Sequence, residues 1–230
     1  MDLMKKPGVR ESAIMAKKLL ASTVLLIILL SMPSLSQVAK REYELLSEEG
    51  KQVTEYVRMM LSGQTRLFLY RGVNMPTYAG TVKCWKTRFR KHITIIRSYR
   101  HDMTYMEVLR PIQVPSGTLE RNGWNYRQAD FIMRAKHGVP AIFLIATYSN
   151  KTVDRSLSDY YYILGAQPSC YVMAALEPTG GKGRALCMYW IKEGTINETH
   201  TACDASYGPC RSIGGAVYNL REETCDFGND

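Results

Sequence analysis

The chain has 230 residues, of which 46% are hydrophobic and 22% are charged, and its formal net charge is +9. Residues 1–36 carry five of the basic and two of the acidic side chains, so a net charge of +6 remains for the rest. The rest is long enough for one domain with its own core, and it contains no internal repeat. Its basic residues are scattered and form no dense run among aromatic residues, which argues against a nucleic-acid partner.

The chain begins with a pattern typical of a secretory signal. Lys17 and Lys18 precede an apolar run over 19–30, and small residues follow that run. The run is shorter than the roughly 20 residues that a membrane span needs. We therefore predict a signal peptide over 1–36, a secreted domain over 37–230 and no membrane association after cleavage. The alternative is an uncleaved anchor.

The cysteines agree with export. Five of the six lie between Cys170 and Cys225, and Cys84 stands alone far upstream. An even number in an exported chain indicates disulfides, although six cysteines allow many pairings that the sequence alone does not distinguish. Zinc binding is the alternative, but no Cys-x-x-Cys pair is present. Two Asn-x-Thr triplets predict glycosylation at Asn150 and Asn197.

The secreted domain begins with a helical pattern and continues with strands. Apolar residues recur at intervals of three and four over 42–61, with glutamates off that stripe, which predicts an amphipathic helix. Beyond it the period changes to two, and Tyr, Val, Ile and Thr become frequent. The predicted strands are 67–70, 81–90, 93–99, 103–110, 124–134, 140–148, 159–165, 169–176 and 184–192. A short helix or an ordered loop is predicted over 196–211, and a last extended segment over 216–220. So many short strands with hairpin-like turns indicate a sandwich or an up-and-down barrel, and a barrel of about eight strands holds one small ligand.

Nothing in the chain is typical of an enzyme. The four histidines are scattered without metal-ligand spacing, no Gly-x-Ser-x-Gly elbow is present, and no pair of carboxylates stands in an apolar setting. We therefore predict no catalytic residues, no metal site and no cofactor.

Two groups of residues resemble a known family. A strand over 67–70 ends in Arg71 and is followed by a loop and the lone Cys84. The later motifs are Cys170-Tyr171-Val172, Cys187-Met188-Tyr189-Trp190, Cys203, Cys210 and Cys225. In this spacing the chain resembles, over about residues 42–225, the tick salivary lipocalins of the histamine-binding-protein family.

The resemblance implies a fold and a set of disulfides. The fold is mainly β: an eight-stranded antiparallel up-and-down lipocalin barrel with an N-terminal helix and a short C-terminal helix, stabilised by disulfides. By the same resemblance the cysteines pair as Cys84–Cys225, Cys170–Cys203 and, for those that remain, Cys187–Cys210. The Gly-x-Trp signature that lipocalins carry near the first strand is missing here.

The resemblance also implies a function, that of a secreted salivary protein that binds and sequesters a small host mediator inside the barrel. Amine-binding members carry an Asp and a Glu where this chain has Tyr171 and Met188. Removing an ammonium ion from water costs several kcal/mol when no carboxylate faces it in the protein. We therefore expect an apolar or anionic lipid of the eicosanoid type rather than a biogenic amine. The expected ligand-binding residues are Tyr171, Met188, Trp190 and Arg97.

Alternatives remain open for the site and for the function. Met188 and Trp190 lie two apart in one strand and face the same side, where they serve either a ligand or core packing alone. Arg97 either meets a ligand carboxylate from the apolar face of its strand or points outwards. The chain is otherwise a histamine or serotonin binder that uses other carboxylates. It is alternatively a loop-mediated inhibitor of a host plasma protein of complement or haemostasis.

Overall fold

The computed structural model describes residues 42–78, 81–114, 117–175, 185–212, 214–223 and 225, with side chains left out from 109 to 122. The signal peptide predicted over 1–36 therefore lies outside the described residues. Within the described ranges, no helix is both long enough and apolar enough to cross a membrane.

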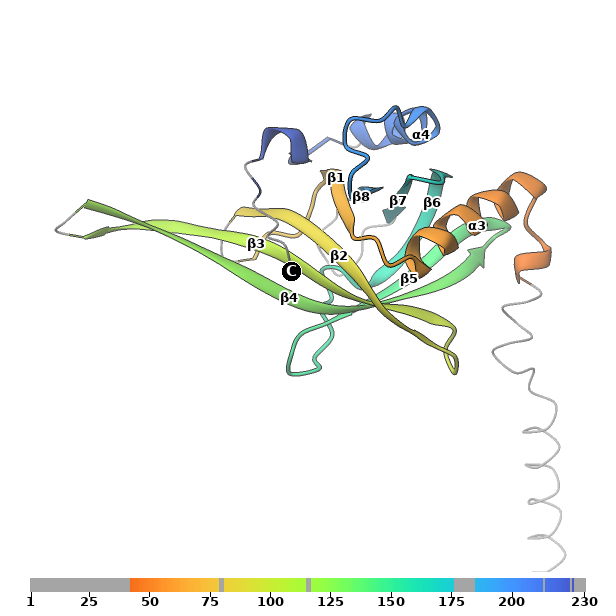
Figure 1. The fold of residues 1–230 in the computed structure, drawn as a ribbon, viewed down its shortest axis with the longest axis horizontal. Coiled ribbons are helices and arrows are strands. Elements are labelled where there is room, and N and C mark those ends of the chain that lie inside the picture. The colour runs from red at the N-terminus through yellow and green to blue at the C-terminus, as the bar shows by residue number, and fades with distance from the viewer. Residues whose placement is uncertain are drawn as a thin grey trace, which may run out of the picture. The chain divides into compact units, whose positions relative to one another are not determined.

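Eight antiparallel strands close into a barrel (Figure 1). Each strand pairs with the next one along the chain, and β1 pairs with both β8 and β2, which joins the two ends of the sheet. This order is that of an up-and-down barrel, as predicted, and not that of a sandwich. The strands are β1 (Leu67–Val73), β2 (Thr81–Ile93), β3 (Ser98–Val114), β4 (Gly117–Lys136), β5 (Val139–Thr147), β6 (Asp159–Gln167), β7 (Cys170–Ala175) and β8 (Leu186–Lys192).

The hairpins around β3 differ from the prediction. Residues 94–97 form a turn between β2 and β3, so the strand predicted over 93–99 is wrong. Ile93 and Ile95 alternate as in a half-buried strand, but Ile95 is 88% exposed, so this alternation does not mark a core face. At its other end β3 pairs with β4 almost to the hairpin tip, across the stretch between 110 and 124 that has no strand pattern. Backbone pairing within one long hairpin needs no apolar face, which explains why the sequence does not reveal it.

Helix α3 (Glu48–Ser62) packs against the strands at one end of the barrel. The Ser47 side chain accepts a hydrogen bond from the Gly50 amide at 3.0 Å, and this N-cap explains why the helix begins later than predicted. Its buried residues Val57, Met60 and Leu61 belong to the same hydrophobic core as the strands. The amphipathic stripe read from the sequence is therefore the face that covers the barrel.

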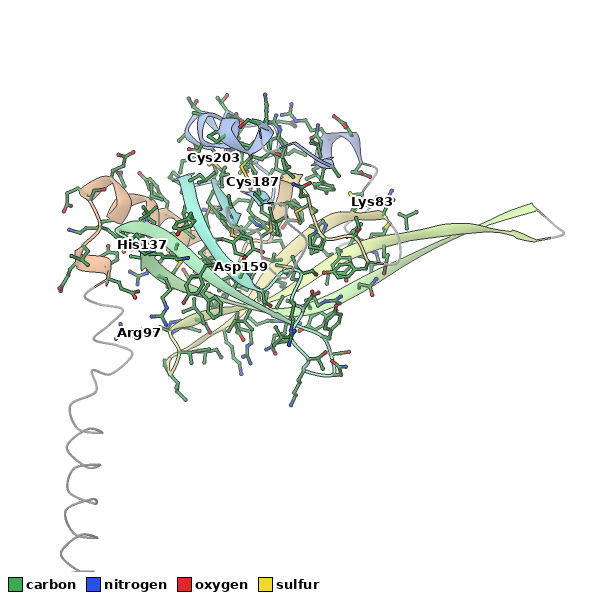
Figure 2. All side chains as sticks on the ribbon, turned by 180° about the vertical axis from the view of Figure 1, so that it is seen from behind. Lys83, Arg97, His137, Asp159, Cys187 and Cys203 are labelled. Atoms are coloured by element: carbon green, nitrogen blue, oxygen red, sulfur yellow. A yellow bond between two sulfur atoms is a disulfide. The ribbon has the colours of Figure 1, made fainter. Side chains whose placement is uncertain are left out.

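Helix α4 (Thr201–Ser212) lies on the outside of the barrel against β6, β7 and β8 (Figure 2). Two disulfides hold it there, and the third joins β2 to the end of the described chain. The pairs are Cys170–Cys203, Cys187–Cys210 and Cys84–Cys225, as the resemblance implies. The last extended segment forms β9 (Val217–Asn219), and the short helix η1 (Leu220–Glu222) follows it. Residues 71–73 of β1 pair with β9, whereas residues 67 and 68 of β1 pair with β2.

A buried histidine connects α3 to the strands. The Nε2 atom of His101 lies 2.8 Å from the carbonyl oxygen of Leu61, and its Nδ1 atom lies 2.8 Å from the Thr87 hydroxyl. A carbonyl oxygen only accepts, so Nε2–H donates to Leu61. In the neutral ring, Nδ1 then accepts from the Thr87 hydroxyl. Burial lowers the pKa of His101 to about 4. The hydrogen bond to Leu61 and the nearby carboxylates raise this pKa, but by less than burial lowers it.

We expect His101 to make the fold weaker in acid. In the unfolded chain its pKa returns to about 6.5, so between pH 6.5 and pH 4 the unfolded state binds the additional proton. The stability from neutral His101 is complete above pH 6.5 and falls by about 3 kcal/mol as the pH drops to 4. Urea unfolding at pH 7.0 and pH 4.5, compared with His101→Gln, measures this loss. Equal losses in both proteins would assign the acid sensitivity to other groups.

Candidate ligand site in the barrel

Strands β7 and β8 form one wall of the barrel interior. Cys170 and Cys187 bond to α4 on the outside, so the alternation of each strand points the neighbouring residues inwards. The β7–β8 register places Tyr171 directly opposite Trp190. Four residues of these strands and one of β1 make up what we call the inner wall, and all are fully buried: Leu69, Tyr171, Met173, Met188 and Trp190.

The prediction that Met188 and Trp190 face the same side is confirmed. Tyr171, Met188 and Trp190 lie together on the inner wall. Arg97 does not join them, because it lies exposed in the turn between β2 and β3 with a φ of +50° (Figure 2). Its expected position on the apolar face of a strand is wrong. Whether any of the four binds a ligand stays a prediction.

Polar atoms on and beside the inner wall lack partners. Within the part of the chain that the structure describes, the indole nitrogens of Trp85 and Trp190 and the hydroxyl of Tyr171 are buried without a hydrogen bond. Trp85 comes from β2 and stacks on Tyr105 of β3, with ring centroids 4.4 Å apart. Burial raises the pKa of Tyr171, so its hydroxyl keeps its proton at any physiological pH. All three groups are thus able to donate a hydrogen bond into an apolar interior.

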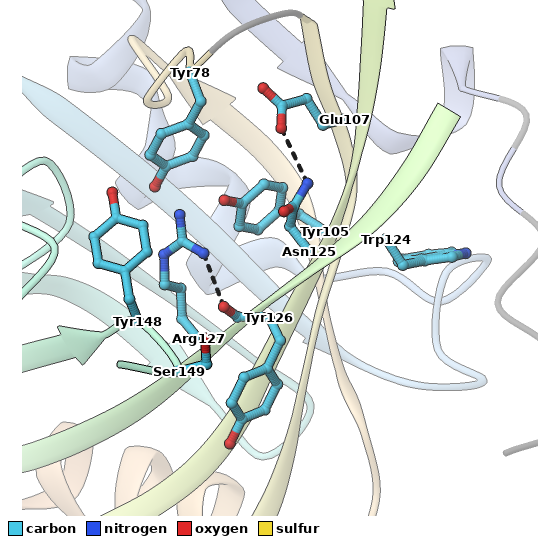
Figure 3. A pocket seen from close by; sticks show the side chains of 9 residues that line it. All are labelled: Tyr78, Tyr105, Glu107, Trp124, Asn125, Tyr126, Arg127, Tyr148 and Ser149. Carbon is cyan, nitrogen blue, oxygen red and sulfur yellow. Dashed lines mark hydrogen bonds between the residues drawn. The ribbon is translucent and has the colours of Figure 1, made fainter. Parts of the chain in front are cut away.

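A pocket of about 470 Å³ lies beside β3 at Tyr105, which is four residues after His101 in the sequence. We call it the mouth pocket, and its lining residues are Tyr78, Tyr105, Glu107, Trp124, Asn125, Tyr126, Arg127, Tyr148 and Ser149 (Figure 3). Its volume is in the range that small-molecule sites commonly have. Tyr105 both lines this pocket and stacks on Trp85, so it connects the wall of the pocket to a buried aromatic residue.

Arg127 lies at the centre of the mouth pocket and is buried. Its Nε donates to the Asp154 carboxylate at 2.8 Å, and its Nη1 donates to the Tyr126 carbonyl at 2.8 Å. Its guanidinium carbon lies 3.7 Å from the ring centroid of Tyr148, and Figure 3 shows the side chains of Arg127, Tyr148 and Tyr78 converging. The side chains of Trp124 and Tyr126 point away from this group.

Asp154 is held as a carboxylate by its neighbours. Burial works to raise the pKa of Asp154, but hydrogen bonds from Ser156, Arg127 and Tyr78 outweigh it and lower that pKa below its ordinary value. The Tyr78 hydroxyl donates to the same carboxylate at 2.8 Å, and burial raises the pKa of Tyr78. Arg127 and Asp154 therefore form a buried and charged pair.

Sequence reasoning did not find this cluster, although one signal was present. Arg127 alternates with Ala129 and Phe131, which are fully buried and lie on the inner face of β4. Because side chains alternate between the two faces of a strand, Arg127 is expected on the inner face as well. The two predicted glycosylation residues, Asn150 and Asn197, are both exposed in turns, and their modification stays a prediction.

Comparisons with known proteins find similar solved structures. No family model matches the sequence, and no curated protein matches it. Japanin from Rhipicephalus appendiculatus, solved with cholesterol bound, is 12% identical with a TM-score of 0.44, over 69% of this chain and 92% of that one. Lobster apocrustacyanin A1 and apocrustacyanin C2 are each 12% identical with a TM-score of 0.37, over 76% of this chain and 86% of theirs. The strand order described above is what shows the lipocalin-like fold of this chain.

Proposed function

We propose that this chain is a secreted lipocalin of the tick salivary kind it resembles, which sequesters one small host mediator in its barrel. The proposed ligand is an apolar or anionic lipid of the eicosanoid type that carries at least one oxygen acceptor. One observation carries this choice: the buried polar atoms of Trp85, Trp190 and Tyr171 are donors without acceptors. An indole N–H only donates, and so does an ammonium group, so an amine leaves both indoles without a partner, although the Tyr171 hydroxyl is able to accept from it.

The energetics favour the same ligand class. A buried donor without a partner costs roughly 1–3 kcal/mol, which a ligand hydroxyl, carbonyl or carboxylate oxygen recovers by accepting. The inner wall has no charged member, so the body of the ligand is expected to be apolar. The Asp154 carboxylate beside the mouth pocket is already paired with the Arg127 guanidinium, and Glu107 accepts from the Asn125 amide at 3.0 Å.

The proposal is tested by calorimetric titration of the disulfide-intact protein with an anionic eicosanoid, histamine and serotonin. We expect binding of the eicosanoid and silence from both amines. In Tyr171→Phe the loss of one hydroxyl should weaken eicosanoid binding roughly three- to tenfold, while stability stays equal or rises because an unpartnered buried group is removed.

The matched control is Tyr160→Phe, which removes a hydroxyl from an exposed tyrosine of neighbouring β6 and should leave the affinity unchanged. Tight amine binding, or equal eicosanoid affinity in the two variants and the parent, would contradict the proposal.

The outer face of β4 favours a second candidate function. Trp124 and Tyr126 are 45% and 41% exposed there, and the Lys86 ammonium lies 5.0 Å from the Trp124 ring centroid. Exposed aromatic residues beside basic ones are typical of protein-binding hot spots. If all three small molecules are silent in the titration and a host plasma protein binds in a salt-sensitive manner, inhibition of that protein becomes the better proposal.

A further inference from the structure

The guanidinium of Arg127 lies inside a cage of aromatic rings. Its central carbon is 3.7 Å from the ring centroid of Tyr148, 5.0 Å from that of Tyr78 and 5.2 Å from that of Tyr105. The carboxylate of Asp154 completes the cage at 2.8 Å from Nε. Tyrosine faces within about 6 Å and one carboxylate are the chemistry that recognises an organic cation.

The cage is assembled from separate parts of the chain. Tyr78 comes from the loop before β2, Tyr105 from β3, and both Tyr148 and Asp154 from the loop between β5 and β6. Arg127 reaches this group from β4 with a side chain that is only 6% exposed, against 2% for Asp154. Stability alone explains such a pair poorly, because a buried ion pair commonly stabilises a fold no more than two apolar residues of similar volume would.

We propose that Arg127 determines the specificity of the mouth pocket by filling a cation cage, made by Tyr78, Tyr105, Tyr148 and Asp154, with its own guanidinium. The occupied cage rejects free organic cations, and the same cage without Arg127 binds alkylguanidinium and alkylammonium ions. The inference deepens the proposed function in one respect, the rejection of amines. Its physical basis does not depend on any lipid ligand.

The test is rescue of Arg127→Ala by N-ethylguanidinium, which contains the atoms that the substitution removes. Ligand that binds only the folded state raises the melting temperature in proportion to ln(1 + [L]/Kd). At roughly ten times the dissociation constant we expect a rise of about 3–6 °C in the variant, which follows this logarithm, and none in the parent protein. N-ethylurea, which has a similar shape and no charge, should give no rise.

Two variants control for the cage itself. Arg127→Ala combined with Asp154→Asn should lose the rescue, because the counter-charge is gone. Arg100→Ala removes an arginine that pairs with Asp130 on the outer face of β3 and β4, at 2.8 Å for each of two hydrogen bonds, and should not respond to N-ethylguanidinium. Histamine and serotonin should bind Arg127→Ala and remain silent with the parent.

The proposal is overturned if N-ethylguanidinium does not raise the melting temperature of folded Arg127→Ala, or if the parent binds the cations equally well. If the variant does not fold alone, the yield of refolding with N-ethylguanidinium is compared with the yield with N-ethylurea, and equal yields overturn the proposal. A failure of eicosanoid binding would leave this rescue measurable. A failure of the rescue would likewise leave the eicosanoid titration intact, so the two proposals fail separately.

Discussion

Removal of the Cys84–Cys225 disulfide, by alanine at both positions, is expected to lower the free energy of unfolding by about 5 kcal/mol. The bond closes a loop with a sequence separation of 141 residues, and restriction of the unfolded chain grows with the logarithm of that length. It also holds the segment that contains β9 beside the start of the barrel. Urea unfolding under oxidising conditions measures the loss.

The matched control is the Cys187–Cys210 disulfide, which spans only 23 residues. Its removal by alanine at both positions should cost about 3 kcal/mol, because the loop that it closes is shorter. Cys84 and Cys187 are both fully buried in strands, so the two double substitutions disturb the core in a similar way. An equal or larger loss for the short loop would show that chain entropy is not the main contribution of these bonds.

Asp154→Asn is the second substitution with a large expected effect. It leaves the Arg127 guanidinium buried without its counter-charge, at an expected cost of about 3–5 kcal/mol in the free energy of unfolding. The amide keeps the size of the carboxylate and its oxygen still accepts from Tyr78, so the loss reports the charge and the hydrogen bonds from Ser156 rather than a cavity. Urea unfolding at pH 7, where Asp154 is ionised, measures it.

Two comparisons make this result specific. Asp130→Asn should cost on the order of 1 kcal/mol, because its partner Arg100 is 27% exposed and its charge is screened by water. The double variant Arg127→Met/Asp154→Leu should be more stable than either charge-removing single variant, because no unpaired charge is left. A cost below 1 kcal/mol for Asp154→Asn would contradict the buried charged pair.

Local patterns predicted much of the fold. The helical period before residue 62 and the change to a period of two are properties of neighbouring residues. The end of α3 and the strands β5 to β8 lie close to where these patterns place them. The strand predictions were wrong where an apolar pattern and an actual strand do not coincide. The turn at 94–97 carries apolar residues without being buried, and the far part of the β3–β4 hairpin forms a strand pair without an apolar alternation.

The sequence by itself determined that Met188 and Trp190 share one face, because the alternation of side chains along β8 depends only on spacing within that strand. That Tyr171 lies on the same side depends on the register between β7 and β8, which only the tertiary structure decided. The sequence did not decide between sandwich and barrel, since closure depends on which distant strands pair with β1. The cage around Arg127 was also decided only in the tertiary structure. Its rings and carboxylate come from separate segments, and no local pattern encodes which loops fold over the same arginine. The specificity that we propose for this barrel therefore depends on contacts that no single stretch of the chain contains.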